Sequence, residues 1–222
     1  MTPRIHIITG HFGSGKTEFS INLALYLKDL YPKVSVVDLD IINMYFRIRE
    51  QKDFLESQGI SVIASSVDAP NLDIPALDPG ILTPLQDSQS QVILDVGGNP
   101  SGARALGRYR NILNTQKVEH LLVVNANRPE TQKVEDVIGF MKNIEGRSTI
   151  PVTGLVNSTH MLKNTSIEDV LRGEALLKEV SKETGLSVKY TAVFENIVDE
   201  CPDELKERLF PIHLYFRNEW MV

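Results

Sequence analysis

The chain has 222 residues, and its 29 acidic residues outnumber 23 lysines and arginines, which leaves a formal charge of −6 at pH 7. A hydrophobic fraction of 42% and a charged fraction of 23% are those of an ordinary globular domain, and they exclude disordered and collagen-like classes. The acidic balance has the wrong sign for a protein that holds DNA by neutralising phosphates, so we expect no nucleic-acid partner.

The length predicts a single domain over residues 1–222, because a typical domain contains about 100–200 residues. The lone cysteine, Cys201, excludes an intramolecular disulfide and a cysteine-rich metal site within one chain. No run of about 18 apolar residues and no signal-like start is present. We therefore expect a cytoplasmic protein without a membrane span.

Short apolar runs alternate along the chain with longer segments of helical period. The predicted strands are residues 4–9, 34–38, 91–96, 119–126, 152–156 and 187–193. The predicted helices are residues 15–30, 47–58, 101–114, 130–145, 167–184 and 203–209. Strands that are apolar throughout, with helices between them, are typical of a mostly parallel sheet covered on both faces. This pattern predicts a three-layer, doubly wound α/β fold.

A proline-rich segment interrupts this alternation. Residues 65–84 contain four prolines and therefore cannot form a central strand or one long helix. A loop of this length in a compact domain is often functional, but it can equally be a surface crossover. The sequence leaves both interpretations open.

The clearest motif lies between the first predicted strand and the first predicted helix. Residues 10–17 read G-H-F-G-S-G-K-T and match G-x-x-x-x-G-K-[ST], the phosphate-binding loop (Walker A motif), in the strand–helix context that the motif requires. Glycines there permit positive φ angles and let backbone N–H groups approach phosphate oxygens, while the following helix N-terminus adds partial positive charge. The predicted nucleotide-binding residues of this loop are Gly10, Gly13, Ser14, Gly15, Lys16 and Thr17.

The chemistry of phosphoryl transfer assigns roles to two of these side chains. Lys16 can reach the β- and γ-phosphates, and the Thr17 hydroxyl can ligate Mg²⁺. The sequence thus predicts a nucleoside triphosphate and Mg²⁺ as ligands.

Acidic residues end the next two predicted strands, as V-V-D-L-D and I-L-D-V-G-G. In an open parallel sheet, ligands bind outside the carboxyl ends of the strands, so Asp38, Asp40 and Asp95 should project toward the phosphate loop. One carboxylate there can hold the hydration shell of Mg²⁺ and another can orient or deprotonate an attacking water. D-V-G-G also has the form of a γ-phosphate sensor that contacts the terminal phosphate through the N–H of Gly98.

The order of phosphate loop, V-V-D-L-D and D-V-G-G resembles the MinD/ParA and CobQ/CobB nucleotide-binding proteins, in the SIMIBI class of P-loop NTPases, over roughly residues 4–200. The resemblance implies that Asp40 positions the catalytic water and that Asp95 holds Mg²⁺ through a water molecule. With Lys16, these form the expected catalytic set. It also implies that Asn157, in G-L-V-N-S, reads the adenine edge. Taken alone, Asn157 could equally be a residue of the turn that ends a strand.

One position departs from that group, whose loop carries a signature lysine directly after its first glycine. Here His11 stands at that position and Phe12 replaces a glycine. A homodimer activated across its interface by the lysine is therefore in question. His11 could play a weaker version of that role, or act as a spacer.

The base favoured by the sequence is adenine. The N-K-x-D motif that usually accompanies guanine specificity is missing from both candidate segments, residues 125–128 and 157–160. An asparagine amide can both donate to and accept from adenine, so we expect ATP rather than GTP. Arg128 could be a second phosphate or base contact, or it could belong only to the start of the following helix.

Three functions fit these residues. The first is a slow Mg²⁺-dependent ATPase that acts as a switch on a protein partner. The second is an ATP-dependent ligase or kinase resembling CobQ/CobB or dethiobiotin synthetase, with a small-molecule acceptor held by residues 65–84. The third is a nucleotide-binding scaffold without catalysis.

Two further segments bear on the partner. Arg104, Arg108 and Arg110 follow the sensor glycines and could contact a partner or form a solvated face. The C-terminal tail from Pro211 has only one basic residue, Arg217, so we expect it to pack on the domain rather than to bind a membrane. Cys201 alone argues against insertion of a metal cluster.

Overall fold

The computed structural model describes residues 3–40, 48–64 and 79–216. Most of the proline-rich segment, residues 65–78, therefore lies outside the described residues, as do the first residue of the predicted helix 47–58 and the end of the C-terminal tail.

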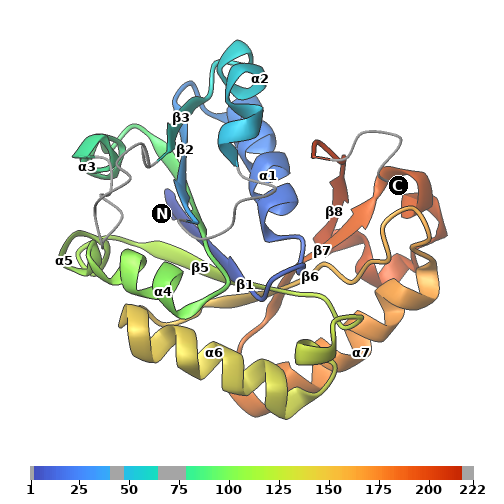
Figure 1. Cartoon of the computed structure of the whole chain (residues 1–222). Helices are drawn as coiled ribbons and strands as arrows, with labels where there is room; N and C mark the ends of the chain where they lie inside the picture. Colours follow the sequence, from blue (N-terminus) through green and yellow to red (C-terminus); the bar gives the residue numbers. More distant parts are fainter. Residues whose placement is uncertain (1–2, 41–47, 65–78, 217–222) are drawn as a thin grey trace.

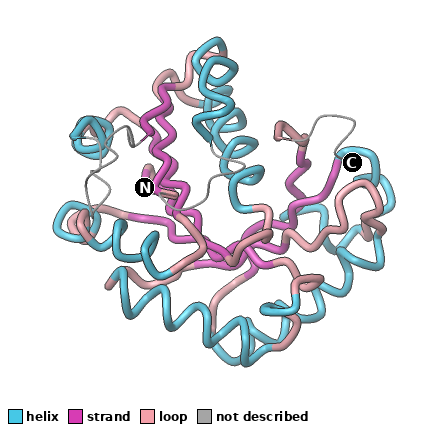
Figure 2. Tube along the Cα trace, in the orientation of Figure 1, coloured by secondary structure: helices cyan, strands magenta, loops and turns pink. Residues whose placement is uncertain are grey.

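The described residues form one sheet in which every strand pairs in parallel with its neighbours (Figures 1 and 2). The strand order is β3-β2-β4-β1-β5-β6-β7-β8. The strands are β1 (Ile5–Gly10), β2 (Val34–Leu39), β3 (Ser61–Ala64), β4 (Gln91–Val96), β5 (Val118–Val124), β6 (Gly154–Asn157), β7 (Val188–Phe194) and β8 (Leu209–Ile212). This order places β1 in the middle of the sheet. The chain continues from the end of β1 into the phosphate loop.

Seven α-helices are described, together with short 3₁₀ helices. The α-helices are α1 (Lys16–Leu30), α2 (Lys52–Ser57), α3 (Leu82–Gln86), α4 (Pro100–Gly107), α5 (Arg110–Leu113), α6 (Val134–Ser148) and α7 (Ile167–Thr184). The 3₁₀ helices are Ile48–Gln51, Pro79–Ile81, Pro129–Thr131, Glu195–Glu200 and Asp203–Arg208.

The helices cover both faces of the sheet. On β1, Ile8 packs into a core that contains Phe19 of α1, whereas Ile5 and Ile7 belong to a second core that contains Leu106 of α4. Successive strand residues point to opposite faces, so these two cores lie on opposite sides of the sheet. Figure 1 shows α1 and α2 on one side and α4, α6 and α7 on the other. The predicted three-layer, mostly parallel α/β fold is confirmed.

The longest helices have clear local causes. α7 begins with a capping box, in which Ser166 and Asp169 each bond the other's backbone, and it ends at Gly185 with φ 75°. α1 is buried along most of its length, as expected of an apolar helix placed directly after the phosphate loop.

The secondary structure differs from the prediction in several places, including the short helix α3, which was not expected. Strands β3 and β8 were not expected, and the predicted helix 203–209 is instead a 3₁₀ helix followed by β8. The sequence of β8, L-F-P-I, is short and contains Pro211, which a strand tolerates at the edge of a sheet, where β8 lies. The predicted helix 101–114 is divided into α4 and α5 just after Gly107, a weak helix former.

Candidate functional site

The phosphate loop joins the end of β1 to the start of α1, as predicted. Gly13 and Gly15 have φ angles of 76° and 84°, which side chains rarely permit. Gly10 does not have a positive φ, so that part of the prediction is wrong. Its lack of a side chain serves close packing instead, since a Cβ there would lie 2.5 Å from both Ser14 Oγ and the carbonyl oxygen of Val123.

The loop fits a phosphate group in the described structure. The Ser14 hydroxyl is buried and has no hydrogen-bond partner among the described residues. Lys16 is the first residue of α1, and its buried ammonium lies 3.4 Å from the Asp40 carboxylate. A buried cation at a helix N-terminus, beside an unsatisfied hydroxyl, is suited to an anionic ligand.

The predicted acidic residues gather at this point. Asp38 and Asp95 are direct partners in the register of β2 and β4, and Asp38 Oδ1 accepts a 2.9 Å hydrogen bond from the Asp40 N–H. Burial raises the pKa of Asp95 to about 7; Lys16 and a Thr17 hydrogen bond oppose this rise, and Asp38 and Asp40 add to it. The structure thus brings Lys16, Thr17, Asp40 and Asp95 into one electrostatic cluster.

A magnesium ion at this cluster would depend on its ligand for part of its coordination. No group of three or more His, Cys, Asp or Glu that could hold a metal occurs in the described part of the chain. Thr17, Asp40 and Asp95 offer one hydroxyl and two carboxylates. Mg²⁺ usually keeps several waters and takes substrate phosphate oxygens as ligands, so these residues fit it.

Of the two glycines after β4, Gly97 packs against Asp40 and Gly98 packs against the phosphate loop. A Cβ on Gly97 would lie 2.7 Å from Asp40 Oδ1, and one on Gly98 would lie 3.0 Å from the backbone of His11 and Phe12. Asn99 then caps α4, since its Oδ1 accepts 2.9 Å hydrogen bonds from the N–H groups of Ser101 and Gly102. A movement of this segment would therefore change its contacts with both the phosphate loop and Asp40.

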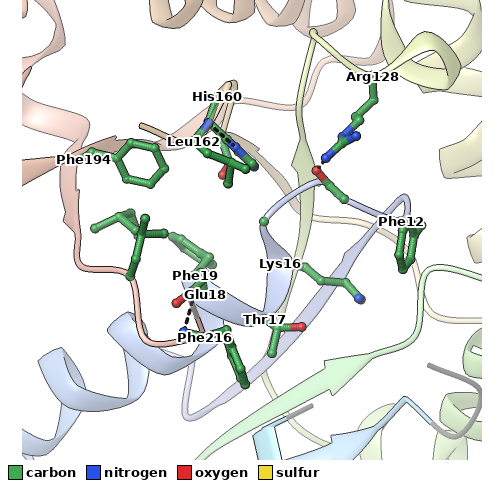
Figure 3. A pocket seen from close by; sticks show the side chains of 15 residues that line it. Phe12, Lys16, Thr17, Glu18, Phe19, Arg128, His160, Leu162, Phe194 and Phe216 are labelled. Carbon is green, nitrogen blue, oxygen red and sulfur yellow. Dashed lines mark hydrogen bonds between the residues drawn. The ribbon is translucent and has the colours of Figure 1, made fainter. Parts of the chain in front are cut away.

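A cavity extends from the phosphate loop across the start of α1 (Figure 3). Its empty volume is about 850 Å³, which includes space open to solvent. It is lined by Phe12, Gly13, Gly15, Lys16, Thr17, Glu18, Phe19, Arg128, Ser158, His160, Leu162, Phe194, Ile212, Leu214 and Phe216. Away from the loop, most of these side chains are apolar.

Asn157 does not line this cavity. Its buried amide Nδ2 donates to the Val170 carbonyl at 2.9 Å and to Glu174 Oε1 at 2.8 Å, while its Oδ1 accepts from the Thr159 N–H at 3.1 Å. Both amide protons therefore already have acceptors. The structure does not support the predicted adenine contact and gives Asn157 the role of holding the loop after β6.

The segment after β5 ties that loop to the phosphate loop. Arg128 lines the cavity, and its Nε donates to the Gly13 carbonyl at 3.1 Å. The fully buried Asn125 donates to the carbonyls of Gly13 and His160, both at 3.3 Å. The sequence singled out Arg128 as a candidate contact but contained no signal for this link.

The residues predicted to meet a partner have local neighbours. The ring of His11 packs edge-on against Phe140, 5.4 Å between centroids, and its Nδ1 lies 4.0 Å from Glu130. This arrangement favours the spacer interpretation of His11. Arg104, Arg108 and Arg110 are exposed, and Arg104 donates a 3.0 Å hydrogen bond to Ser101 Oγ.

Two other predictions concern parts away from the cavity. Cys201 is buried, and burial raises the pKa of its thiol. None of the helices in residues 3–40, 48–64 and 79–216 is long and apolar enough to cross a membrane.

Comparisons with known proteins give matches among solved structures. No protein-family model matches the chain, and no curated protein matches it. Cell division protein FtsY from Thermotoga maritima aligns with a TM-score of 0.62 at 22% identity, covering 86% of this chain and 62% of that one.

Two further matches were solved with GDP. The signal recognition particle receptor FtsY from Elizabethkingia anophelis has a TM-score of 0.59 at 19% identity, covering 87% of this chain and 58% of that one. The signal recognition particle 54 kDa protein from Aeropyrum pernix has a TM-score of 0.58 at 21% identity, with coverages of 86% and 41%. The chain thus spans less than two thirds of these proteins, and the likeness shows that its fold is an α/β P-loop NTPase-like fold.

Proposed function

We propose that this chain is a magnesium-dependent nucleoside-triphosphate hydrolase that acts as a nucleotide-dependent switch on a protein partner. The observation that carries the proposal is the buried cluster of Lys16, Asp40 and Asp95 beside a phosphate loop with two positive-φ glycines. The fold neighbours support the SIMIBI class of P-loop NTPases. They give no support to the MinD/ParA or CobQ/CobB subgroup.

Each residue of the cluster has a role in this proposal. Lys16 and the backbone N–H groups of the loop bind the phosphates. Thr17 and Asp95 hold Mg²⁺, which supplies neutralisation of the charge that develops on the transferred phosphoryl group. In the structure Asp40 forms an ion pair with Lys16. When the Lys16 ammonium binds the phosphates instead, Asp40 orients the attacking water.

The switch depends on the segment after β4. Gly98 contacts the loop that binds the terminal phosphate, and the same segment continues into α4. Loss of the γ-phosphate would remove one contact of this segment, which would change the position of the exposed arginines on α4 and α5. This is the order-to-disorder logic by which nucleotide switches generally work.

The base in this proposal is a purine. The sequence favours adenine because the N-K-x-D motif that usually accompanies guanine specificity is missing from residues 125–128 and 157–160. The GDP bound in two fold neighbours favours guanine. Both ATP and GTP are therefore tested.

The alternative ligase or kinase function gains no support. Most of the segment expected to hold a small acceptor, residues 65–84, lies outside the described residues, and no described contact points to an acceptor.

The test is phosphate release from Mg²⁺-ATP and Mg²⁺-GTP without any added acceptor, by wild type, Lys16→Ala and Asp40→Asn. The proposal expects slow release by wild type and at least tenfold less by each variant. The proposed hydrolase activity is refuted if wild type releases no phosphate, even after addition of the proteins that it captures in a pull-down. Release that requires a small acceptor would favour the ligase or kinase.

A further inference from the structure

The C-terminal strap, defined as residues 212–216, crosses the first half of α1. Two hydrogen bonds join Asn22 to the backbone of His213, at 2.9 and 3.0 Å. The Glu18 carboxylate accepts from the N–H groups of Tyr215 and Phe216, each at 3.0 Å (Figure 3). Four hydrogen bonds thus fasten the strap to the helix that begins with Lys16.

The side chains of the strap alternate in direction. Ile212, Leu214 and Phe216 line the cavity, whereas Tyr215 stacks on Phe54 of α2 with ring centroids 5.2 Å apart. The chain leaves β8 after Ile212 and bends at Tyr215 and Phe216. The strap therefore forms a wall of the cavity with one side and is anchored on α2 with the other.

A second part of the lining comes from the loop after β6 and from the end of β7, where Phe194 pairs with Ile212 in the strand register. Phe194 and Leu162 belong to this part, and the ring of His160 lies 5.9 Å from that of Phe194. Figure 3 shows Phe194 and His160 on one side of the cavity and Glu18 and Phe216 on the other. A lining that is mostly apolar, with few polar groups, suits a flat aromatic ring.

The same cavity reaches the phosphate loop, because Gly15, Lys16 and Thr17 also line it. A ligand that carries an aromatic ring at one end and phosphates at the other matches this division. We propose that Leu214 and Phe216 of the strap form the base-binding wall and that Glu18 is a positioning residue that holds this wall on α1. The inference rests on the proposed function.

This arrangement has a consequence for specificity. Each oxygen of the Glu18 carboxylate accepts a hydrogen bond from the strap backbone, so the one carboxylate in the cavity lining already has a structural role. The base is held mainly by apolar contact and stacking, which every base can make. ATP and GTP should therefore bind with affinities within about tenfold of each other.

The experiment compares three probes in the presence of Mg²⁺: ATP, GTP and inorganic tripolyphosphate, which carries the phosphates without a base. The variants are Phe216→Ala, Glu18→Ala and Glu18→Gln. The matched control is Tyr215→Phe, on the same strap but outside the cavity lining. Calorimetric titration gives each Kd, and thermal unfolding confirms that each variant is folded.

We expect Phe216→Ala and Glu18→Ala to weaken both nucleotides about tenfold, the usual effect of losing one aromatic stacking partner. Tripolyphosphate should bind these variants as it binds wild type. Glu18→Gln keeps one acceptor and should fall between wild type and Glu18→Ala. Tyr215→Phe should match wild type.

Unchanged nucleotide affinity in Phe216→Ala would overturn the proposal. Equal weakening of nucleotide and tripolyphosphate would also overturn it, because the strap would then act on the phosphate loop or on the fold. If wild type binds tripolyphosphate but neither nucleotide more tightly, the base wall is refuted while the phosphate site stands. If wild type binds none of the three probes, the proposed function itself fails.

Discussion

The proposed phosphate end of the cavity and its proposed base end are built in opposite ways. The phosphate end is mostly one contiguous loop, residues 10–17, whose backbone conformation is set by glycines and whose charged groups are buried. The base end gathers side chains from the loop after β6, the end of β7 and the C-terminal strap. Chemistry that needs backbone N–H groups is encoded locally, whereas an apolar slot can be assembled from distant segments.

The two ends also differ in what a substitution should do. Buried polar groups at the phosphate end depend on one another, so the loss of one leaves a charge or hydrogen bond unsatisfied. At the base end the contacts are apolar and shared among several side chains, so single losses should be smaller. The following predictions test this contrast, from the largest expected effect to the smallest.

Replacing Lys16 by alanine should weaken Mg²⁺-ATP, Mg²⁺-GTP and tripolyphosphate by a similar factor. The loss of one buried charged partner typically costs about 2–5 kcal/mol, which corresponds to at least a thirtyfold change in Kd. Titration calorimetry measures this, with Lys142→Ala, an exposed lysine on α6, as the control. If Lys16→Ala weakened the binding of the two nucleotides but not of tripolyphosphate, the contrast between the two ends would be wrong.

Acidic pH should lower the stability of the protein through His120, which lies beside the strand residue that precedes the phosphate loop. Its Nε2 lies 3.0 Å from Thr9 Oγ1, directly before the loop, and burial lowers the pKa of His120 to about 4. Below pH ~6.5 the unfolded chain binds a proton there that the native protein does not bind until about pH 4. Stability should therefore fall by about 3 kcal/mol as the pH drops through this window.

Urea unfolding of wild type and His120→Leu at several pH values isolates that contribution, since all other titrating groups are shared. The stability advantage of wild type over the variant should shrink steadily from pH 7 to pH 4. A difference that stays constant with pH would show that His120 does not enter folding as a neutral residue.

Replacing Asn157 by alanine should destabilise the fold and leave the ratio of ATP to GTP affinity unchanged. The substitution removes hydrogen bonds to Val170, Glu174 and Thr159, and a broken buried network costs about 1–3 kcal/mol. Thermal unfolding and nucleotide titration check the two parts. A selective loss of ATP binding would restore Asn157 as the reader of adenine.

Glycine substitutions should separate backbone constraint from helix propensity. Alanine at Gly15 would keep a φ of 84° and place a Cβ 2.6 Å from Ser158 Oγ, so we expect a loss of about 1–2 kcal/mol and weaker phosphate binding. Alanine at Gly139, exposed on α6 with nothing within 4 Å of its Cβ, should gain about 0.5–1 kcal/mol. Equal effects at both positions in denaturant unfolding would contradict the role given to the loop.

The phosphate end could be predicted from the sequence because its residues either form one contiguous motif or end recognisable strands. The motif, Asp40 and Asp95 lie at the ends of strands whose apolar runs are easy to recognise, and parallel pairing brings those ends together. The role of Gly10 was different from the prediction, since its contact with Val123 of β5 depends on strand order.

The base end could not be predicted, because its parts meet only through the order β6-β7-β8. The strap follows a four-residue strand that contains proline and has no clear period. The Asn157 prediction rested on resemblance, and its environment depends on Gly173 of α7, where a Cβ would collide with the Asn157 amide. No local sequence pattern predicts such a tertiary contact.

The most direct test of the account is a titration of wild type with a series of phosphates in the presence of Mg²⁺: triphosphate, diphosphate and monophosphate of both adenosine and guanosine. The account predicts that affinity falls with each phosphate removed and that the two bases give similar values. Failure of both triphosphates to bind at about millimolar concentration would contradict the central claim, as would equal affinity for triphosphate and monophosphate.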